Sequence, residues 1–245
     1  MSVAVPAPPP LTIGHHGVLR VGMPFPPDSR QRVQQTIQAP WAAIGLVSAT
    51  MTTGAVLEST GFVIDSRYVV TVAHAVFDSE EGGNARSVTF ECARNAAQIP
   101  FGRVPVQRWH KPVQYPTGGR PYDYCLLELG TALPSEVSPY QLVAAADREL
   151  TGPEFQIAGY PDDKAPENSM WFDSGRLLSP PDARILRYRI STAAGQSGAA
   201  VSNYLDVGTT DVVGIHAGRA LDASCNEAVR VTREIIDQIQ TWRTT

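Results

Sequence analysis

The most informative stretch of this chain reads Ala194-Gly195-Gln196-Ser197-Gly198-Ala199-Ala200-Val201. It places Ser197 between two glycines, directly ahead of an apolar run that is typical of a strand. Because glycine allows tight backbone turns, the amides of Gly195 and Ser197 can converge on one point and receive the oxyanion of an acyl-transfer intermediate. By itself the stretch is also compatible with an ordinary loop, since turns rich in glycine and serine are common.

Two further segments supply the groups that would activate such a serine. The β-branched run 69–72 leads into His74, which has an alanine on each side. Asp123 opens the mostly apolar stretch 124–129, a context that suits a carboxylate that is buried and hydrogen-bonded. A serine hydroxyl is a weak nucleophile until a base takes its proton, and the base needs a third group to fix its tautomer. We therefore expect Ser197 to act as nucleophile, His74 as general base and Asp123 as the orienting group.

In this order along the chain, the three residues resemble the triad of chymotrypsin-like serine proteases. Further segments narrow the resemblance to the glutamyl endopeptidase branch, and together they extend over about residues 28 to 243. These segments are residues 28–33, 39–45, 60–64, 159–164, 170–171, 191–192 and 214–216. The resemblance implies an all-β fold of two packed antiparallel six-stranded β-barrels with a C-terminal α-helix, and a serine endopeptidase that needs no cofactor and no metal.

The resemblance also implies a specificity pocket. Branch members that cleave after acidic residues carry a threonine five positions before the nucleophile and a histidine in a Gly-Ile-His segment, and this chain has Thr192 and His216 at those places. A hydroxyl and an imidazole that converge on a substrate carboxylate supply charge-assisted hydrogen bonds of roughly 1.5 to 3 kcal/mol each. We expect Glu or Asp at P1, the residue before the cleaved bond. Without the family context, a core histidine held by a backbone carbonyl is the favoured interpretation of His216.

The resemblance further implies that a mature N-terminal ammonium helps to bind the acidic side chain. Such a terminus requires processing, and the bond between Arg20 and Val21 is the candidate position, with Val21 as the mature N-terminus. The residues before it contain a cluster of prolines and read as a disordered leader. His15 and His16 in this leader lack spaced partners, so they do not indicate a metal site.

Length and composition agree with one catalytic domain. The chain has 245 residues with 43% hydrophobic content, and its 20 glycines and 20 prolines divide it into many short segments, which favours an all-β fold. We expect a leader at 1–27 and a protease domain at 28–245, with the first barrel at about 33–140, the second at about 141–231 and a helix at 232–243. Thr232 is the expected N-cap of that helix, whose apolar face should pack on the second barrel.

Charge and cysteine content exclude several classes of function. The net charge of −4, with no cluster of Lys and Arg, argues against nucleic-acid binding, and no apolar stretch predicts a membrane span. Polypeptide substrates and a monomer are expected. Cys92, Cys125 and Cys225 are odd in number, so a disulfide framework is not expected. No signal peptide is recognisable although most relatives are secreted, which leaves the location open.

Two alternative functions remain open at this point. The first is a serine protease of another P1 specificity, because Ala217 stands where the branch often has an aromatic residue and Arg219 also reshapes the expected pocket wall. The second is a non-catalytic, protease-like binding domain. Against the second stands the complete set of triad residue types, since such domains usually lose one of them.

Overall fold

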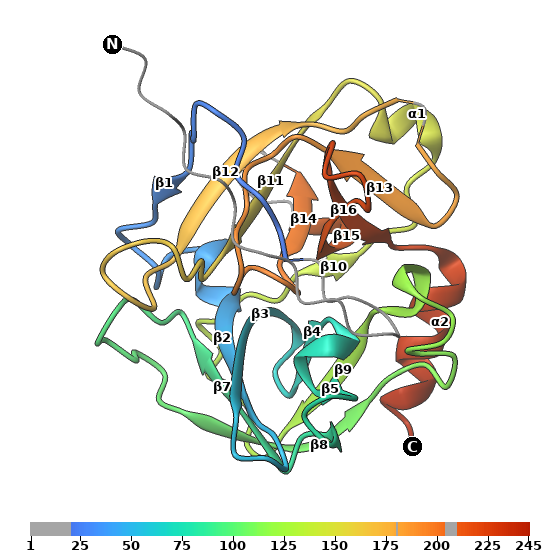
Figure 1. Ribbon diagram of the computed structural model, residues 1–245. Helices are drawn as coiled ribbons and strands as arrows, with labels where there is room; N and C mark the ends of the chain where they lie inside the picture. The colour runs from blue at the N-terminus through green and yellow to red at the C-terminus, as the bar shows by residue number, and fades with distance from the viewer. Residues whose placement is uncertain (1–20, 180, 204–209) are drawn as a thin grey trace.

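The computed structural model describes residues 21–179, 181–203 and 210–245. Its strands form two β-barrels that pack against each other, the first below the second in Figure 1. The first twenty residues, with His15, His16 and Arg20, lie outside the described residues, so the leader and the domain limit at residue 27 stay predictions. No helix in the described ranges has both the length and the apolar character needed to cross a membrane.

Six antiparallel strands close the first barrel in the spatial order β2-β3-β4-β9-β8-β7. They are β2 (Ile44–Thr50), β3 (Val56–Asp65), β4 (Tyr68–Thr71), β7 (Ser87–Cys92), β8 (Val104–His110) and β9 (Cys125–Leu129). Apolar and β-branched residues dominate several of them, as in β4 and β9, and such residues favour the pleated, half-buried surface of a sheet. A separate short hairpin consists of β5 (Phe77–Asp78) and β6 (Gly83–Asn84).

The second half of the chain forms an antiparallel sheet in the order β12-β11-β14-β15-β16-β13. Its strands are β11 (Glu154–Gly159), β12 (Trp171–Arg176), β13 (Ile185–Tyr188), β14 (Ala200–Asn203), β15 (Asp211–Arg219) and β16 (Asn226–Arg230). The two ends of the sheet meet where Leu177 bridges Tyr188 and where the N–H of Leu178 donates to the carbonyl of Arg187 at 2.7 Å. This contact closes a second six-stranded barrel.

Short elements complete the fold. Strand β1 (Gln31–Arg32) pairs with β12, and β10 (Gln141–Leu142) pairs in parallel with β15. The helical turns are η1 (Trp41–Ala43), η2 (Ala73–Ala75), η3 (Arg120–Tyr122) and α1 (Asp147–Leu150). The predicted all-β fold of two six-stranded barrels is therefore confirmed, and the short turns are additions to it.

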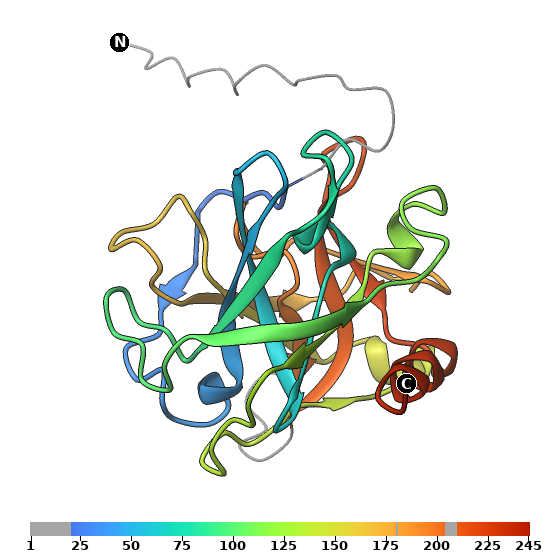
Figure 2. The ribbon, with the colours of Figure 1, turned by 90° about the horizontal axis from the view of Figure 1, so that it is seen from below.

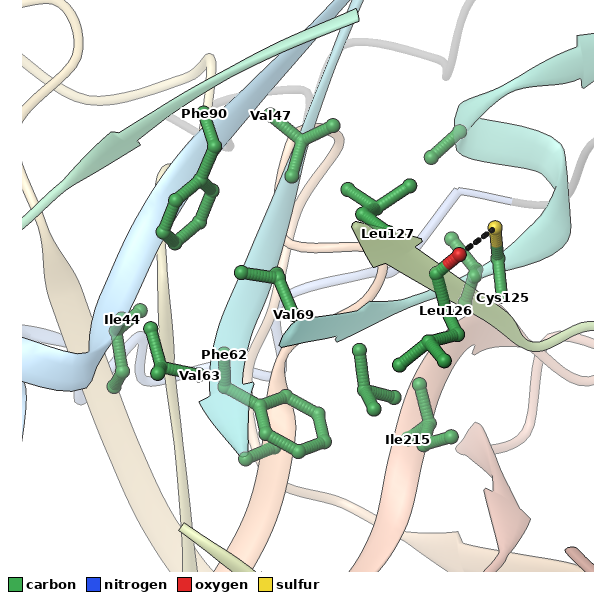
Figure 3. Close-up of a cluster of buried hydrophobic side chains, with 14 of the residues drawn as sticks. Ile44, Val47, Phe62, Val63, Val69, Phe90, Cys125, Leu126, Leu127 and Ile215 are labelled. Carbon is green, nitrogen blue, oxygen red and sulfur yellow. Dashed lines mark hydrogen bonds between the residues drawn. The ribbon is translucent and has the colours of Figure 1, made fainter. Parts of the chain in front are cut away.

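One apolar cluster extends across both barrels, and a second, smaller cluster lies within the second barrel. Figure 3 shows Phe62, Val69 and Leu126 of the first barrel together with Ile215 of β15, and all four side chains are fully buried or nearly so. Burying a side chain of this size contributes about 1.5 to 3 kcal/mol. The shared core therefore fixes the barrels relative to each other, which matters because residues from both barrels meet at the site described below.

Helix α2 (Arg233–Trp242) lies near the C-terminus, at the edge of the molecule in Figure 2. The hydroxyl of Thr232 accepts from the N–H of Ile235 at 3.3 Å, so the predicted N-cap is confirmed. The predicted packing partner is wrong for the end of the helix. The Trp242 ring lies 5.9 Å from His110 and 5.7 Å from Tyr124, because the helix crosses to the first barrel and covers apolar rings there.

Candidate active site

A buried histidine and a buried aspartate form the most closely coupled pair of the site. His74 lies in turn η2, directly after β4, and Asp123 follows turn η3. Nδ1 of His74 is 2.7 Å from Oδ2 of Asp123, and the backbone N–H of His74 donates to Oδ1 at 3.1 Å. Both carboxylate oxygens are thus occupied. A carboxylate at this distance favours the tautomer with the proton on Nδ1, which leaves Nε2 of His74 free to accept a proton.

The charge of Asp123 is maintained in spite of its burial. Burial alone would raise the pKa of its carboxyl group, but His74 and the guanidinium of Arg120 outweigh that effect and hold the pKa below its usual value. Nη1 of Arg120 lies 3.5 Å from Oδ2 of Asp123. The aspartate is therefore an anion across the neutral pH range, as an orienting group for an imidazole has to be.

Ser197 lies on a loop of the second barrel that the first barrel holds in place. Its carbonyl accepts from the N–H of Thr60 at 2.8 Å, and the hydroxyl of Thr60 donates to the carbonyl of Gly195 at 2.8 Å. Gly195 and Gly198 have φ angles of +87° and +90°. A side chain on Gly195 would collide with the carbonyl of Tyr160, so this position requires glycine for space as well as for conformation.

Two backbone donors of this loop are free. Among the described residues, neither the N–H of Gly195 nor that of Ser197 donates to a protein acceptor. Unpaired donors beside a serine can receive developing negative charge. No hydrogen bond joins the hydroxyl of Ser197 to His74 within the same residues, and in a ligand-free site such contacts are often longer than in the reacting complex.

Thr192 and His216 are fully buried and lie next to each other. A Cβ atom added to Gly22 would lie 2.8 Å from Nε2 of His216 and closer still to Oγ1 of Thr192. Nδ1 of His216 is 2.7 Å from the hydroxyl of Tyr188, whereas Nε2 is a buried polar atom with no hydrogen-bond partner in the described part of the chain. The ring is therefore held by a hydrogen bond at Nδ1, and the buried Nε2 has no partner in the same residues.

Burial and neighbouring positive charge keep His216 neutral. Burial, together with the charges of Arg120 and His74, lowers its pKa to about 3, and the backbone of Glu227 acts weakly in the opposite direction. Burial also raises the pKa of the Tyr188 phenol well above its usual value. Tyr188 is thus a neutral phenol that can donate to Nδ1 of His216.

The side chain of Asn226 forms hydrogen bonds both with Thr192 and with Met23, which lies near the start of the described residues. Its Nδ2 group lies 2.9 Å from Oγ1 of Thr192 and 2.8 Å from the carbonyl of Met23, while its Oδ1 accepts from the N–H of Met23 at 3.0 Å. The N–H of Thr192 donates to the same Met23 carbonyl at 3.2 Å. Val21, the predicted mature N-terminus, therefore lies two residues from a segment bonded to the pocket.

The structure thus brings the predicted site residues together in two groups. His74 and Asp123 make direct contact, and Thr192 and His216 line one small region, with Gly195 and Ser197 on the loop between β13 and β14. Sequence reasoning missed the supporting side chains Thr60, Arg120, Tyr188 and Asn226. No motif pointed to their roles. Tyr188 lies 28 positions from His216, and Asn226 lies 34 positions from Thr192.

Cys92, Cys125 and Cys225 are all buried and free. In the ranges that the structure describes, no group of three or more His, Cys, Asp or Glu side chains is placed to hold a metal ion.

Comparisons with known proteins cover most of the chain. A family model described as a trypsin-like peptidase domain matches residues 59–215. A glutamyl endopeptidase of Bacillus licheniformis is 28% identical over 221 residues, which are 88% of this chain and 67% of that protein. An extracellular metalloprotease of Bacillus subtilis is 28% identical over 218 residues, 88% of this chain and 68% of that protein. A solved structure of a Glu endopeptidase in complex with MPD matches with a TM-score of 0.78 at 23% identity, over 88% of this chain and 97% of that one, and shows the shared fold.

Proposed function

Since this chain belongs to the trypsin-like peptidase family and is a serine endopeptidase, we propose that it cleaves polypeptides with Ser197 as the nucleophile. His74 takes the proton of the Ser197 hydroxyl as general base and later donates it to the leaving amine. Asp123 holds the imidazole in the required tautomer and stabilises the imidazolium. The 2.7 Å contact between His74 and Asp123 supports these roles.

The amides of Gly195 and Ser197 form the proposed oxyanion hole. Attack of Ser197 on the scissile carbonyl turns that oxygen into an anion, which two preorganised N–H donors stabilise more strongly than they stabilise the neutral carbonyl. The absence of protein acceptors for both donors among the described residues supports this role. Loss of one such donor typically costs about 10² to 10³ in turnover.

The proposed substrate preference is Glu or Asp at P1, and one observation carries it: Nε2 of His216 is buried, has no partner within the described residues and lies beside Oγ1 of Thr192. If Tyr188 donates to Nδ1, the hydrogen of the neutral ring is on Nε2. Asn226 donates to Oγ1 of Thr192, which leaves the threonine hydrogen free to point elsewhere. The pocket then presents two donors to a substrate carboxylate, and an apolar P1 side chain would leave both unpaired.

The N-terminal amine is the third proposed ligand of the acidic side chain. Gly22 lies against Thr192 and His216, and Asn226 holds Met23. Cleavage before Val21 would therefore produce an ammonium group near the pocket, whereas in the unprocessed chain the nitrogen of Val21 is a neutral amide. We expect protein that begins at Val21 to prefer Glu at P1 more strongly than protein that begins at Met1. Equal activity and equal preference of the two forms would remove the amine from the mechanism.

The pocket assignment is tested with two peptides that differ only in Glu or Gln at P1. The variants His216→Ala and Thr192→Val should each lower kcat/KM for the Glu peptide about tenfold or more, since each removes one hydrogen bond to a charged group. The Gln peptide should be affected less. Equal losses on both peptides would mean that the two residues support the fold and do not select the substrate.

The oligomeric state and the partners are part of the same proposal. We propose a monomer that acts on polypeptides, and the net charge of −4 does not favour binding to nucleic acid. Sedimentation of the Ser197→Ala protein tests the monomer without interference from self-cleavage. A dimer at micromolar concentration would contradict it.

A further inference from the structure

The guanidinium of Arg120 bridges the two barrels beside the proposed triad. Arg120 begins turn η3 on the first-barrel side, and its side chain is 10% exposed. Nη1 lies 3.5 Å from Oδ2 of Asp123, and Nε lies 3.7 Å from Oε2 of Glu227 in β16. Nη1 also donates to the carbonyl of Ala217, and Nη2 donates to that of Arg219 at 3.3 Å, both in β15. One side chain thus contacts the proposed triad aspartate and strands β15 and β16 of the other barrel.

We propose that Arg120 is a positioning residue for peptide hydrolysis, which holds the His74–Asp123 pair of the first barrel in place against strands β15 and β16 of the second. This inference rests on the proposed triad. His216 precedes Ala217 in β15. The strand to which Arg120 donates hydrogen bonds therefore also carries the proposed pocket histidine. Movement of the pair relative to β15 would change the distance between the base and the substrate, and reaction rates are sensitive to displacements of about 1 Å.

The charge of Arg120 is needed as well as its hydrogen bonds. Asp123 and Glu227 are both buried carboxylates, and a buried anion is costly unless a cation pairs with it. Arg120 lies between the two, and Arg187 pairs with the far side of Glu227 at 3.2 Å. Asp123, Arg120, Glu227 and Arg187 thus form a row of side chains whose charges alternate in sign.

Several titratable groups surround Arg120, and they determine how its removal would act. They are His74, Tyr115, Asp123, Tyr188, His216 and Glu227. Without the guanidinium, the coupled His74–Asp123 pair would take up a proton at higher pH, because a cation within a few ångströms no longer opposes it. The acid limb of the pH profile of kcat/KM should therefore move to higher pH.

The experiment measures kcat and KM of one peptide from pH 4 to pH 9 for wild-type protein and for Arg120→Gln and Arg120→Lys. The Gln variant should lose about tenfold in kcat with a smaller change in KM, and its acid limb should rise by about one pH unit. The Lys variant keeps the charge but not the forked geometry, so its acid limb should stay near the wild-type position while kcat falls.

A matched control separates positioning from simple structural support. Arg230 is also mostly buried, pairs with Asp147 at 2.8 Å and donates to two backbone carbonyls, but it has no contact with the triad. Arg230→Gln should lower the melting temperature and leave the acid limb unchanged. Glu227→Gln removes the carboxylate that competes for Arg120, so its acid limb should move to lower pH, and this variant keeps the test decisive if Arg120→Gln fails to fold.

Different results would overturn the role of Arg120 and the role of the proposed triad. An Arg120→Gln protein whose acid limb and kcat stay within twofold of wild type would overturn the role of Arg120, and so would a Glu227→Gln profile that does not move. Full activity of a His74→Ala protein would instead overturn the triad itself. We expect the acid limbs of Arg120→Lys and of Arg230→Gln to stay near the wild-type position.

Discussion

Tyr188→Phe removes a single oxygen atom from beneath the proposed specificity pocket. The hydroxyl lies 2.7 Å from Nδ1 of His216, and both side chains are fully buried. Losing this hydrogen bond leaves a buried nitrogen without a partner, which should cost about 1 to 3 kcal/mol of folding stability. The phenylalanine ring otherwise fills the same space, so no larger rearrangement is expected.

The effect on selectivity is smaller and has a definite sign. Without the phenol, the hydrogen of His216 is no longer directed to Nε2, and the hydrogen bond from Nε2 to a substrate carboxylate is weakened by about 1 kcal/mol. This corresponds to roughly a fivefold loss in the ratio of kcat/KM for a Glu peptide to that for a Gln peptide. The ratio is measured at a pH above the acid limb and well below the melting temperature of the variant.

Tyr140→Phe is the matched control for this substitution. Tyr140 is also deeply buried, but its ring packs edge-on against Phe62 with a centroid distance of 5.8 Å, in the shared core. The control should keep the Glu to Gln ratio of the wild type. A Tyr188→Phe protein that is folded, less stable and unchanged in this ratio would refute the idea that Tyr188 directs the hydrogen of His216.

Three further predictions concern stability and reactivity. Because the pKa of His216 falls from the usual 6.5 to about 3 on folding, unfolding takes up a proton between those values, so the free energy of unfolding should decrease as the pH falls from about 6.5 towards 3. Urea midpoints that stay constant over this range would contradict the burial of a neutral His216. Burial raises the pKa of the Cys92 thiol to about 12 and also raises the pKa of the Cys125 thiol. Neither cysteine should therefore react with a maleimide in the folded protein. Labelling of the folded protein as fast as labelling in urea would contradict this prediction. Thr232→Ala removes the N-cap of α2 and should cost about 1 kcal/mol in denaturant unfolding, whereas a loss below a few tenths would mean that packing alone holds the helix.

The sequence predicted features that depend on local pattern or on a complete motif. Thr232 is an example of local pattern, because a cap and its helix are neighbours in the chain. The residues around Ser197 are an example of a motif, because glycine is needed on both sides for backbone reasons that hold in any context. The order of His74, Asp123 and Ser197 then indicated the barrels that bring them together.

The supporting contacts could not be predicted in this way. Thr60 bonds to Gly195 over 135 positions, and Arg120 bonds to Ala217 over 97 positions. Threonine and arginine occur on most protein surfaces, so their types carry no signal until the fold brings them to the site. The packing partner of the end of α2 was predicted wrongly for the same reason. An amphipathic pattern shows which face of a helix is buried, but not which part of the molecule covers it.

Cleavage of a peptide library by protein that begins at Val21, beside its Ser197→Ala variant, tests the central claim most directly. Mass spectrometry gives every cut site, and nucleophile removal in such triads typically costs about 10⁶ in turnover. We predict cuts after Glu and Asp that vanish in the variant. Cuts that persist in folded Ser197→Ala protein, or an absence of cuts by folded wild-type protein, would contradict the account.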